Sequence, residues 1–303
     1  MFYIGVDGGG TKTRFSLMDE EENIVATVEK GTCHFNQVGF DGLENLLNEG
    51  LKELLLKANV KQRDVKRGCL GLAGYGKVKS AIPKIEGIVD GVFKGIEVLL
   101  FNDVHIAHAG ALAGIDGIVI IAGTGSIGYS LKNGENKRVG GWGYTIGDEG
   151  SAYWIGKKAI EYFSKQADGR VAKGRLYDVF REKLELEDDY DLIKYVNEKI
   201  KADRGEVARF ARICSKAAID GDINAIDIFN QAGKELSLLI NVLAKDFGDN
   251  KVVASYIGGV FNSEELILKP LRENIDKGIE LVEPKYSPEI GACLLAKYNK
   301  NNQ

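Results

Sequence analysis

One arrangement of strands and turns occurs twice in the chain. Residues 2–28 contain an apolar segment, a glycine-rich turn, an alternating apolar and polar segment, a polar turn and a further strand-like segment. The same succession restarts at Gly117 as GIVIIAGTGSIGYSLKNGENKRV, about 113 positions later. Alternation of period two predicts strands, so each copy predicts a β-hairpin with a glycine turn at its tip. The copies share architecture rather than residue identities, and they predict an α/β protein of two lobes with a central cleft.

The rest of the chain supplies the helices and further strands. In the first lobe, the apolar spacing predicts helices over 39–58 and near 77–91, and strands over 68–74 and 96–103. In the second lobe, it predicts helices over 151–166, 189–201, 205–220 and 223–247, a strand over 252–260 and a closing helix from Pro288. We expect an N-terminal lobe of residues 1–112 and a C-terminal lobe of residues 113–288, with the closing helix, about 289–303, packed on the N-terminal lobe.

The composition excludes several classes of protein. The net charge is −4 over 303 residues, so we expect no surface for nucleic acid. No apolar run approaches the roughly 20 residues that span a bilayer, and the N-terminus does not look like a secretory signal. Cys33, Cys69, Cys214 and Cys293 are widely spaced, which argues against a zinc knuckle or a disulfide framework. We therefore expect a cytoplasmic protein that binds neither nucleic acid nor a membrane.

The first glycine turn lies in VDGGGTKT, residues 6–13. It does not fit the P-loop motif, because Thr11 stands where that motif requires lysine. It does not fit the dinucleotide fingerprint either, because Thr13 occupies the place of the third glycine. A hairpin turn of small residues nevertheless exposes backbone N–H groups to an anion. A turn that needs glycine only for its tightness is the alternative, and for Thr11 and Thr13 both interpretations stay open.

The second glycine turn matches the dinucleotide fingerprint G-x-G-x-x-G over residues 123–128, and Asp148 follows twenty residues later. That fingerprint requires a helix to begin at the loop. Here an alternating segment continues to Asn133 and Gly134, and an Asn-Gly pair in that place is a strong signal for a β-hairpin. We therefore interpret the turn as the tip of a hairpin. Two such turns, one in each lobe, could clasp a polyphosphate from opposite sides.

A third glycine segment, YIGGVFNS at residues 256–263, completes a recognisable set. With it, essentially the whole chain resembles the actin-like sugar-kinase superfamily. VDGGGTKT is similar to the first phosphate motif of that superfamily, IIAGTGS to the second, and YIGGVFNS to the adenosine motif. The segment RVGGWGYTIGDEGSAYWIG, residues 138–156, resembles the N-acetylglucosamine kinase branch, grouped with the BadF/BadG/BcrA/BcrD ATPases. The resemblance implies a two-lobed actin-like ATPase fold, which is ribonuclease H-like, and it excludes the ROK-type kinases, whose cysteine-rich zinc motif has no counterpart.

The resemblance also implies roles for individual residues, with ATP and Mg²⁺ as cofactors. Asp103 matches the catalytic base, in contact with the sugar; the metal position, Asp7, is inferred from its place beside the first glycine turn. The other positions that match sugar contacts are Asn36, Gly141, Trp142, Gly143 and Asp148. The positions that match nucleotide contacts are Gly9, Gly10, Thr11, Lys12, Thr13, Gly123, Thr124, Gly125, Gly258, Gly259 and Asn262.

Each of these roles has a plainer alternative. Asp103 ends a strand, where a carboxylate can take the proton of a sugar hydroxyl, but an aspartate there can also simply cap the next helix. Asp7 is the only carboxylate beside the first turn, so we expect it to position Mg²⁺ through water; a turn-forming aspartate is the alternative. Lys12 either meets a phosphate oxygen or is solvated, and Trp142 either stacks on the sugar or fills core. His105 and its neighbour His108 have helical spacing that permits metal binding, but no third ligand is evident.

The function that the resemblance implies is ATP-dependent phosphorylation of the 6-hydroxyl of N-acetylglucosamine, for amino-sugar salvage or cell-wall recycling. N-acetylmuramic acid is a further candidate substrate, and glucosamine kinase is the near alternative. An activator of a 2-hydroxyacyl-CoA dehydratase is a more distant one, because such proteins hold an iron–sulfur cluster through cysteines and no cluster motif is present here. A sugar-sensing transcription regulator is disfavoured, because the chain starts directly on its first strand. The resemblance suggests a homodimer.

Overall fold

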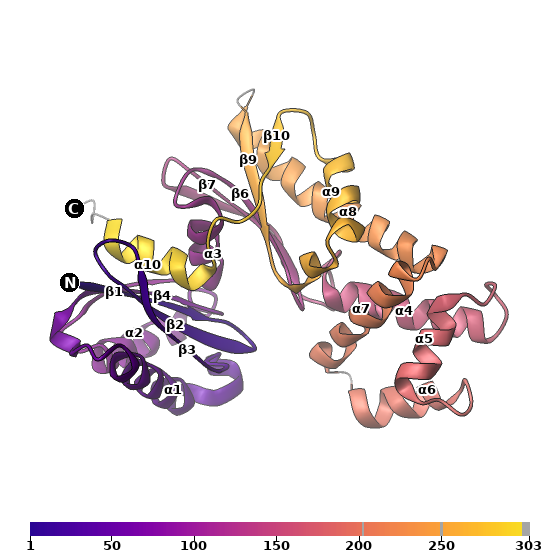
Figure 1. Ribbon diagram of the computed structural model, residues 1–303, viewed down its shortest axis with the longest axis horizontal. Helices are drawn as coiled ribbons and strands as arrows, with labels where there is room; N and C mark the ends of the chain where they lie inside the picture. The colour runs from indigo at the N-terminus through magenta and orange to yellow at the C-terminus, as the bar shows by residue number, and fades with distance from the viewer. Residues whose placement is uncertain (202, 249–250, 299–303) are drawn as a thin grey trace. The chain divides into compact units, whose positions relative to one another are not determined.

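The computed structural model describes residues 1–201, 203–248 and 251–298 (Figure 1). The chain forms two compact units. Unit 1 comprises Met1–Asp116 and Glu283–Gln303, and unit 2 comprises Gly117–Val282. The C-terminal segment therefore returns to the unit in which the chain begins.

Unit 1 is built on a five-stranded sheet. The first three strands run antiparallel to their neighbours, and the last two run parallel to the first. In spatial order the strands are β3 (Ile24–Gly31), β2 (Lys12–Met18), β1 (Phe2–Gly8), β4 (Val65–Leu72) and β5 (Glu97–Phe101). The parallel pairing of β1 with β4 carries the ends of both strands to the same edge, where the first glycine turn lies.

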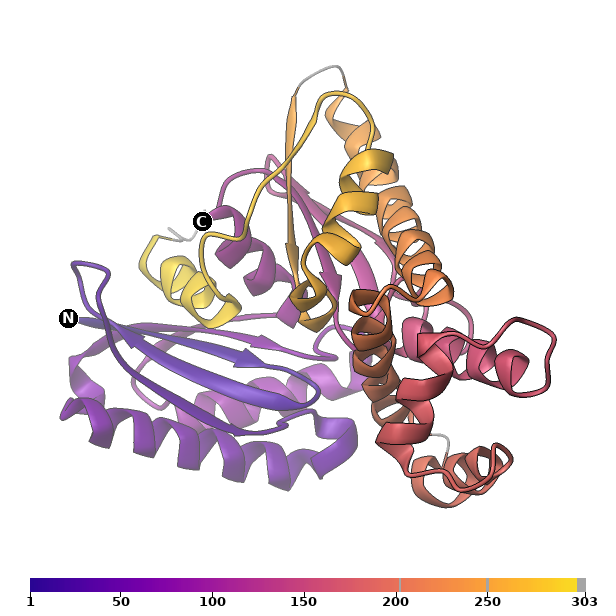
Figure 2. The same cartoon turned by 45° about the vertical axis from the view of Figure 1, so that its right-hand side comes forward.

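Helices cover both faces of this sheet (Figures 1 and 2). Helices α1 (Phe35–Ala58) and α2 (Ile82–Val92) pack on one face, and α3 (Asp103–Leu112) and α10 (Pro288–Tyr298) pack on the other. Short 3₁₀ turns lie at Gln62–Asp64 and Lys79–Ala81. The first core contains Phe15, Leu17, Leu47 and Leu54, and the second contains Tyr3, Cys69, Ile106, Ala292 and Cys293. Burying a large apolar side chain completely stabilises the fold by about 1.5–3 kcal/mol.

A glycine lets α10 approach the sheet unusually closely. A Cβ atom on Gly5 of β1 would lie 2.0 Å from the carbonyl oxygen of Glu289, so no other residue fits between strand and helix. The first turn of α10 therefore lies directly on β1. This contact places Glu289 on the same face of β1 as Asp7, two residues along the strand from Gly5.

Unit 2 repeats the sheet of unit 1. Its spatial order is β10 (Ile279–Leu281), β9 (Val252–Ile257), β6 (Gly117–Ala122), β7 (Ser126–Lys132) and β8 (Glu135–Gly140). Three consecutive antiparallel strands are again followed by two strands parallel to the first of them. The predicted duplication of architecture is confirmed. The second glycine turn joins β6 to β7, and Asn133 and Gly134 turn the chain into β8 with positive φ angles of 51° and 82°. No helix begins at the turn, so the match to the dinucleotide fingerprint does not indicate a dinucleotide-binding loop.

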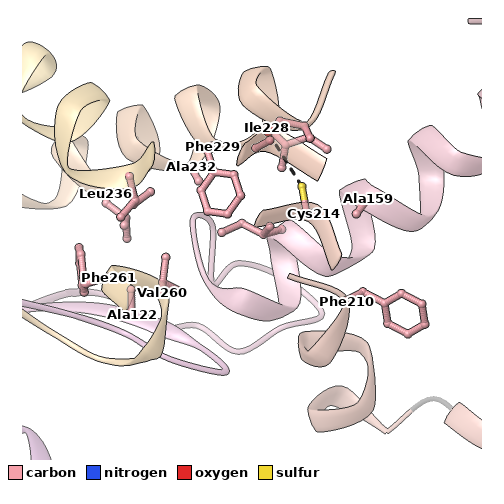
Figure 3. Packing of buried hydrophobic residues seen from close by; sticks show 14 of the residues in the cluster. Ala122, Ala159, Phe210, Cys214, Ile228, Phe229, Ala232, Leu236, Val260 and Phe261 are labelled. Atoms are coloured by element: carbon pink, nitrogen blue, oxygen red, sulfur yellow. Dashed lines mark hydrogen bonds between the residues drawn. The ribbon is translucent and has the colours of Figure 1, made fainter. Parts of the chain in front are cut away.

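The helices of unit 2 surround a core of their own. They are α4 (Ala152–Ala167), α5 (Arg175–Leu184), α6 (Asp191–Tyr195), a π-helical turn (Val196–Ile200), α7 (Arg204–Ile219), α8 (Ile223–Ala244), η4 (Lys245–Phe247), η5 (Gly259–Ser263) and α9 (Glu265–Asn274). Figure 3 shows that Val260 and Phe261 of η5 lie in this core near Leu236 of α8 and Ala122 of β6. None of the described helices is long and apolar enough to cross a membrane.

Several elements differ from the sequence prediction, and three of these differences have a clear structural cause. Helix α1 begins at Phe35 rather than at residue 39, because the ring nitrogen of His34 accepts a hydrogen bond from the Asn36 N–H; a kink at Gly39 follows. Helix α5 was not predicted at all. Its N-terminus is held by Asp222, whose carboxylate accepts a hydrogen bond from the Leu176 N–H at 2.7 Å. The strand predicted over 252–260 ends at Ile257, because Gly258 and Gly259 turn the chain into η5.

Candidate active site

The first glycine turn, residues 9–11, is held in place through its carbonyl groups. The Gly9 carbonyl accepts a bond from Thr32 Oγ1 at 3.1 Å, and the Gly10 carbonyl accepts one from Gln37 Nε2 at 3.0 Å. Within the described part of the chain, the N–H groups of Gly10 and Thr11 have no hydrogen-bond partner. They are therefore available to an anion. The sequence interpretation overlooked Thr32 and Gln37, which carry no motif of their own.

The remaining residues of VDGGGTKT differ in their surroundings. Lys12 is exposed at the start of β2, and its Nζ lies 3.2 Å from Glu29 Oε2. Thr13 is completely buried, and its hydroxyl has no hydrogen-bond partner among the described residues. The Thr13 side chain thus lies in the core under the turn rather than on its surface. Only its backbone is placed to support the turn.

Two carboxylates predicted to carry the chemistry lie within electrostatic range of each other in unit 1. Asp7 is on β1 opposite Arg14, and Asp103 is the first residue of α3. Burial, together with the negative charges of Asp103 and Glu289, raises the pKa of Asp7 to about 7, while Arg14 and Lys12 oppose the shift. Burial also raises the pKa of Asp103, against the positive charge of Lys77 and a hydrogen bond from the Val104 N–H.

Glu289 is a third, unexpected member of this acidic group. It is 6% exposed, its Oε1 accepts a bond from Ser287 Oγ at 2.6 Å, and its Oε2 has no partner among the described residues. The nearest cation is Arg14, whose Nη1 lies 3.9 Å from Oε1. The three carboxylates, which all lie in the described part of the chain, are not arranged as direct ligands of one metal ion. Since hard divalent cations take oxygen ligands and keep part of their hydration shell, such an ion would meet these carboxylates through water.

The helix-capping alternative for Asp103 is only partly correct. The N-cap of α3 is Asn102, whose Oδ1 accepts from the Val104 N–H at 3.2 Å while its Nδ2 donates to the Tyr75 carbonyl. Asp103 Oδ1 accepts from the same N–H at 3.1 Å. Since Asn102 already performs the capping, the second oxygen of Asp103 is left for another partner.

Asn36 lies in the first turn of α1 and its side chain is exposed. The segment that carries it, residues 32–37, also supplies Thr32 and Gln37 to the first glycine turn. The structure therefore brings Asn36 and that turn to one region of unit 1, although they are far apart in the sequence.

The second glycine turn, residues 123–125, is bonded to the segment that follows the predicted sugar-contacting residues. The Gly123 carbonyl accepts from the Ala152 N–H at 2.8 Å, and Ser126 Oγ donates to the Glu149 carbonyl at 2.7 Å. The turn and the start of α4 thus form one hydrogen-bonded assembly within unit 2.

Asp148 lies against this turn. A Cβ atom on Gly125 would come within 2.6 Å of Asp148 Oδ2, so a glycine is required there for the carboxylate to approach. Asp148 Oδ1 accepts from the Gly143 N–H at 3.3 Å, and burial raises the pKa of the carboxyl group against that bond. Arg138 holds the same segment through the Gly141 carbonyl at 2.7 Å. Trp142 is 74% exposed, so it does not fill the core.

The third glycine segment connects the second turn to a cavity. A Cβ atom on Gly258, whose φ is 119°, would lie 2.3 Å from the carbonyl oxygen of Ala122, the residue that precedes the turn. From there η5 leads to a cavity of about 1020 Å³ between α7, α8 and α9, with Asn262 on its wall. A cavity of this size accommodates a small organic ligand or cofactor.

The histidines on α3 do not form part of either group. His105 stacks on Phe101 at 4.3 Å between ring centroids, and burial lowers the pKa of His105 to about 4. His108 is buried. Within the described residues, no three His, Cys, Asp or Glu side chains are arranged as ligands of one metal ion.

Comparison with known proteins gives a consistent result. The BadF/BadG/BcrA/BcrD ATPase family matches residues 4–296. The chain is 30% identical to an N-acetylmuramic acid/N-acetylglucosamine kinase of Clostridium acetobutylicum and 30% identical to an N-acetyl-D-glucosamine kinase of Dictyostelium discoideum, in each case over 98% of both chains. A solved structure from Chromobacterium violaceum, provisionally described as an N-acetylglucosamine kinase, matches 97% of this chain and 98% of its own with a TM-score of 0.78 and 28% identity. The predicted fold class, that of actin-like ATPases among the sugar kinases, is confirmed.

Proposed function

Because the chain belongs to the BadF/BadG/BcrA/BcrD ATPase family, we propose that it transfers the terminal phosphoryl group of ATP to the 6-hydroxyl of N-acetylglucosamine. The chain is a sugar kinase, and its full-length relatives are kinases of amino sugars. N-acetylmuramic acid is the second substrate in this proposal, with amino-sugar salvage or cell-wall recycling as the role. The protein would act as a cytoplasmic homodimer.

The observation that carries the proposal is the surroundings of the second glycine turn. On one side the turn contacts Asp148, in the segment that resembles the sugar-binding part of the family. On the other side Gly258 lies against Ala122, and the chain leads from there to the cavity. One turn of small residues thus adjoins both a polar segment suited to a sugar and a cavity suited to a nucleoside. A turn that was merely tight would need neither neighbour.

The base and ribose of the nucleotide would bind in the cavity of unit 2, and each glycine turn is by itself a proposed phosphate contact. The backbone N–H groups of Gly10 and Thr11 in unit 1 supply donors of the kind that phosphate oxygens accept. Thr124, at the tip of the second turn, and Gly259 and Asn262, along η5, are the corresponding positions in unit 2. Lys12, although near Glu29, is exposed enough to reach a phosphate.

In this proposal Asp103 accepts the proton of the sugar hydroxyl. Phosphoryl transfer requires positioning, charge neutralisation and a group that accepts this proton. Burial raises the pKa of Asp103, which increases its proton affinity and so favours a role as general base. Asp7 would hold Mg²⁺ through water, with Glu289 adding negative charge to the same region. When bound, Mg²⁺ supplies neutralisation of the phosphate charge.

The sugar would be held by Asp148 and the glycines around Trp142. Asp148 presents a buried carboxylate, and ionised carboxylates form strong hydrogen bonds with hydroxyl groups. Trp142 is exposed, so its ring face is available for stacking on a pyranose. Asn36 keeps its proposed role as a sugar contact, on the segment of unit 1 that holds the first glycine turn. The alternative activity as a dehydratase activator finds no support in the cysteines, because all four are buried and burial raises the pKa of the Cys33 thiol to about 11.

A coupled ADP-release assay tests the proposal directly. The sugars are N-acetylglucosamine, N-acetylmuramic acid, glucosamine, N-acetylmannosamine and glucose, and 6-deoxy-N-acetylglucosamine reports whether the 6-hydroxyl is the acceptor. We expect turnover with N-acetylglucosamine and none with its 6-deoxy analogue. No turnover with any amino sugar would remove the proposal, and turnover with glucosamine alone would replace the substrate.

The role of Asp103 is tested in the same assay. Asp103→Asn keeps the shape of the side chain but cannot take a proton, so we expect turnover to fall by at least about 100-fold, the usual contribution of a general base. ATP binding should change little. Asp90→Asn, at an exposed position of α2 in the same unit, is the matched control and should leave turnover unchanged. Near-normal turnover by Asp103→Asn would exclude Asp103 as the base.

A further inference from the structure

Glu264, between η5 and α9, has a strained backbone. Its φ is 50° and its ψ is −126°, a combination that strongly favours glycine over a residue such as glutamate. Four other non-glycine residues with positive φ end helices in the ordinary left-handed conformation, with ψ between 37° and 44°: Asn59, Ala113, Glu185 and Lys201. Glu264 is therefore different in kind from these helix ends.

The surrounding structure enforces this conformation. The Glu264 N–H donates to the Phe261 carbonyl at 3.0 Å, and the Glu264 carbonyl accepts from the N–H groups of Ile267 and Leu268 at 3.1 and 2.9 Å. Val260 and Phe261 are anchored in the core on one side (Figure 3), and Ile267 is fully buried on the other. The chain is thus fixed at both ends of the strained residue. A glycine would adopt the same angles without strain.

Packing does not offset the strain of a glutamate in this place. The Glu264 side chain is exposed on the wall of the cavity of about 1020 Å³. Within the described residues its carboxylate has no hydrogen bond or ion pair. The neighbouring Glu265 is paired with Arg272, and Asp227, also on the cavity wall, accepts a bond from Gln231 Nε2 at 2.6 Å. The strained residue thus presents an unpaired acceptor to the cavity.

The path of the chain indicates which part of a nucleotide meets this carboxylate. Glu264 follows Gly258 by six residues, and Gly258 touches the residue before the second glycine turn. At about 2.0 Å per residue in a 3₁₀ helix, the backbone of Glu264 lies roughly 12 Å along the chain from Gly258. A carboxylate repels phosphates, so it is unsuited to the end of the ligand that the turn would bind. It is well suited to a vicinal diol, because an ionised carboxylate has two acceptor oxygens and no donor.

We propose that Glu264 accepts hydrogen bonds from the 2′- and 3′-hydroxyls of the ribose and thereby selects ribonucleotides over 2′-deoxyribonucleotides. The proposal rests on the nucleotide site of the proposed function. The proposal explains why a glutamate occupies a backbone conformation in which glycine would be more stable. The strained residue lies on the wall of the cavity, where η5 ends and α9 begins.

Binding of ATP, 2′-deoxy-ATP and 3′-deoxy-ATP by isothermal titration calorimetry tests this. The proteins are the wild type, Glu264→Gln and Glu264→Gly. Glu273→Gln is the matched control, since Glu273 lines the same cavity from a regular helical position. We expect the wild type to prefer ATP, and Glu264→Gln to bind ATP at least about tenfold more weakly, the value of a hydrogen bond to a charged group. Binding of 2′-deoxy-ATP should change much less, so that the preference collapses, while Glu273→Gln should retain it.

The strain has a separate readout that needs no ligand. Glu264→Gly should melt at a higher temperature than the wild type, whereas Glu264→Gln should not. An unchanged preference for ATP in Glu264→Gln, with ATP still bound, would overturn the assignment of Glu264 and leave the proposed function intact. A wild type that binds none of the three nucleotides would overturn both. No rise in melting temperature for Glu264→Gly would refute the strain on which the assignment rests.

Discussion

Replacing Asp7 with asparagine should stabilise the protein, although Asp7 is a candidate functional residue. Its carboxylate is removed from water and lies near Asp103 and Glu289, and Arg14 and Lys12 compensate only in part. These surroundings raise the pKa of Asp7 from its ordinary 3.8 to about 7. Near neutral pH, Asp7 in the folded protein is therefore either a destabilised carboxylate or a protonated carboxylic acid. In the unfolded chain the same group would have lost its proton.

The pH dependence of the effect follows from the direction of the shift. Below pH 3.8 the carboxyl group is protonated in both states, so its ionisation contributes nothing to stability. Between pH 3.8 and about 7 the folded state binds more protons than the unfolded state, so stability is lost as the pH rises. Above that range the loss is complete and amounts to about 4 kcal/mol, at 1.36 kcal/mol for each unit of pKa. Asp7→Asn removes this loss without changing the volume of the side chain.

Urea denaturation followed by circular dichroism at pH 4.5 and pH 8, without nucleotide or divalent cations, measures the difference. We expect Asp7→Asn to exceed the wild type in free energy of unfolding by about 4 kcal/mol at pH 8 and by only about 1 kcal/mol at pH 4.5. Asp90→Asn, at an exposed position in the same unit, should show no such dependence. Equal differences at the two pH values, or a less stable Asp7→Asn at pH 8, would refute the idea that Asp7 is destabilised by burial and like charge.

Three further outcomes are expected. Gly258→Ala should lower the melting temperature and weaken ATP binding, because its Cβ would lie 2.3 Å from the Ala122 carbonyl at a φ of 119°; an unchanged melting curve would contradict this. Asp222→Ala should reduce the free energy of unfolding by about 2–4 kcal/mol in urea titration, because three backbone N–H groups lose their acceptor. A loss below about 1 kcal/mol would show that water replaces the carboxylate. The four cysteines, including Cys33, should resist a thiol-reactive dye until urea is added, because they are buried; rapid labelling of the native protein would show that they are accessible.

Much of the architecture is readable from local patterns. Strand alternation and glycine turns depend on residues close together in the chain, and they predicted both hairpins and their repetition, which the two sheets confirm. The Asn-Gly pair at 133–134 was enough to reject the dinucleotide fingerprint. Helix α5 was missed although its apolar residues have helical spacing, because the charged residues among them hide the pattern. The positions of Asp103 and Asp148 were predicted from motifs, but the motifs do not report their surroundings.

Only the tertiary structure determined the burial and the electrostatic surroundings of those residues. Glu289 belongs to the group around Asp7 because Gly5 lets α10 lie on β1, a contact between the two ends of the chain. Thr13 is in the core, Trp142 is exposed and Glu264 is strained for the same kind of reason: each depends on segments that pack from elsewhere. Burial and electrostatic interaction arise from distances in space, whereas a sequence pattern records only distances along the chain. The sequence by itself therefore determined the strands, turns and candidate residues, and the packing of distant segments determined which of those residues are buried, charged against their neighbours or open to a ligand.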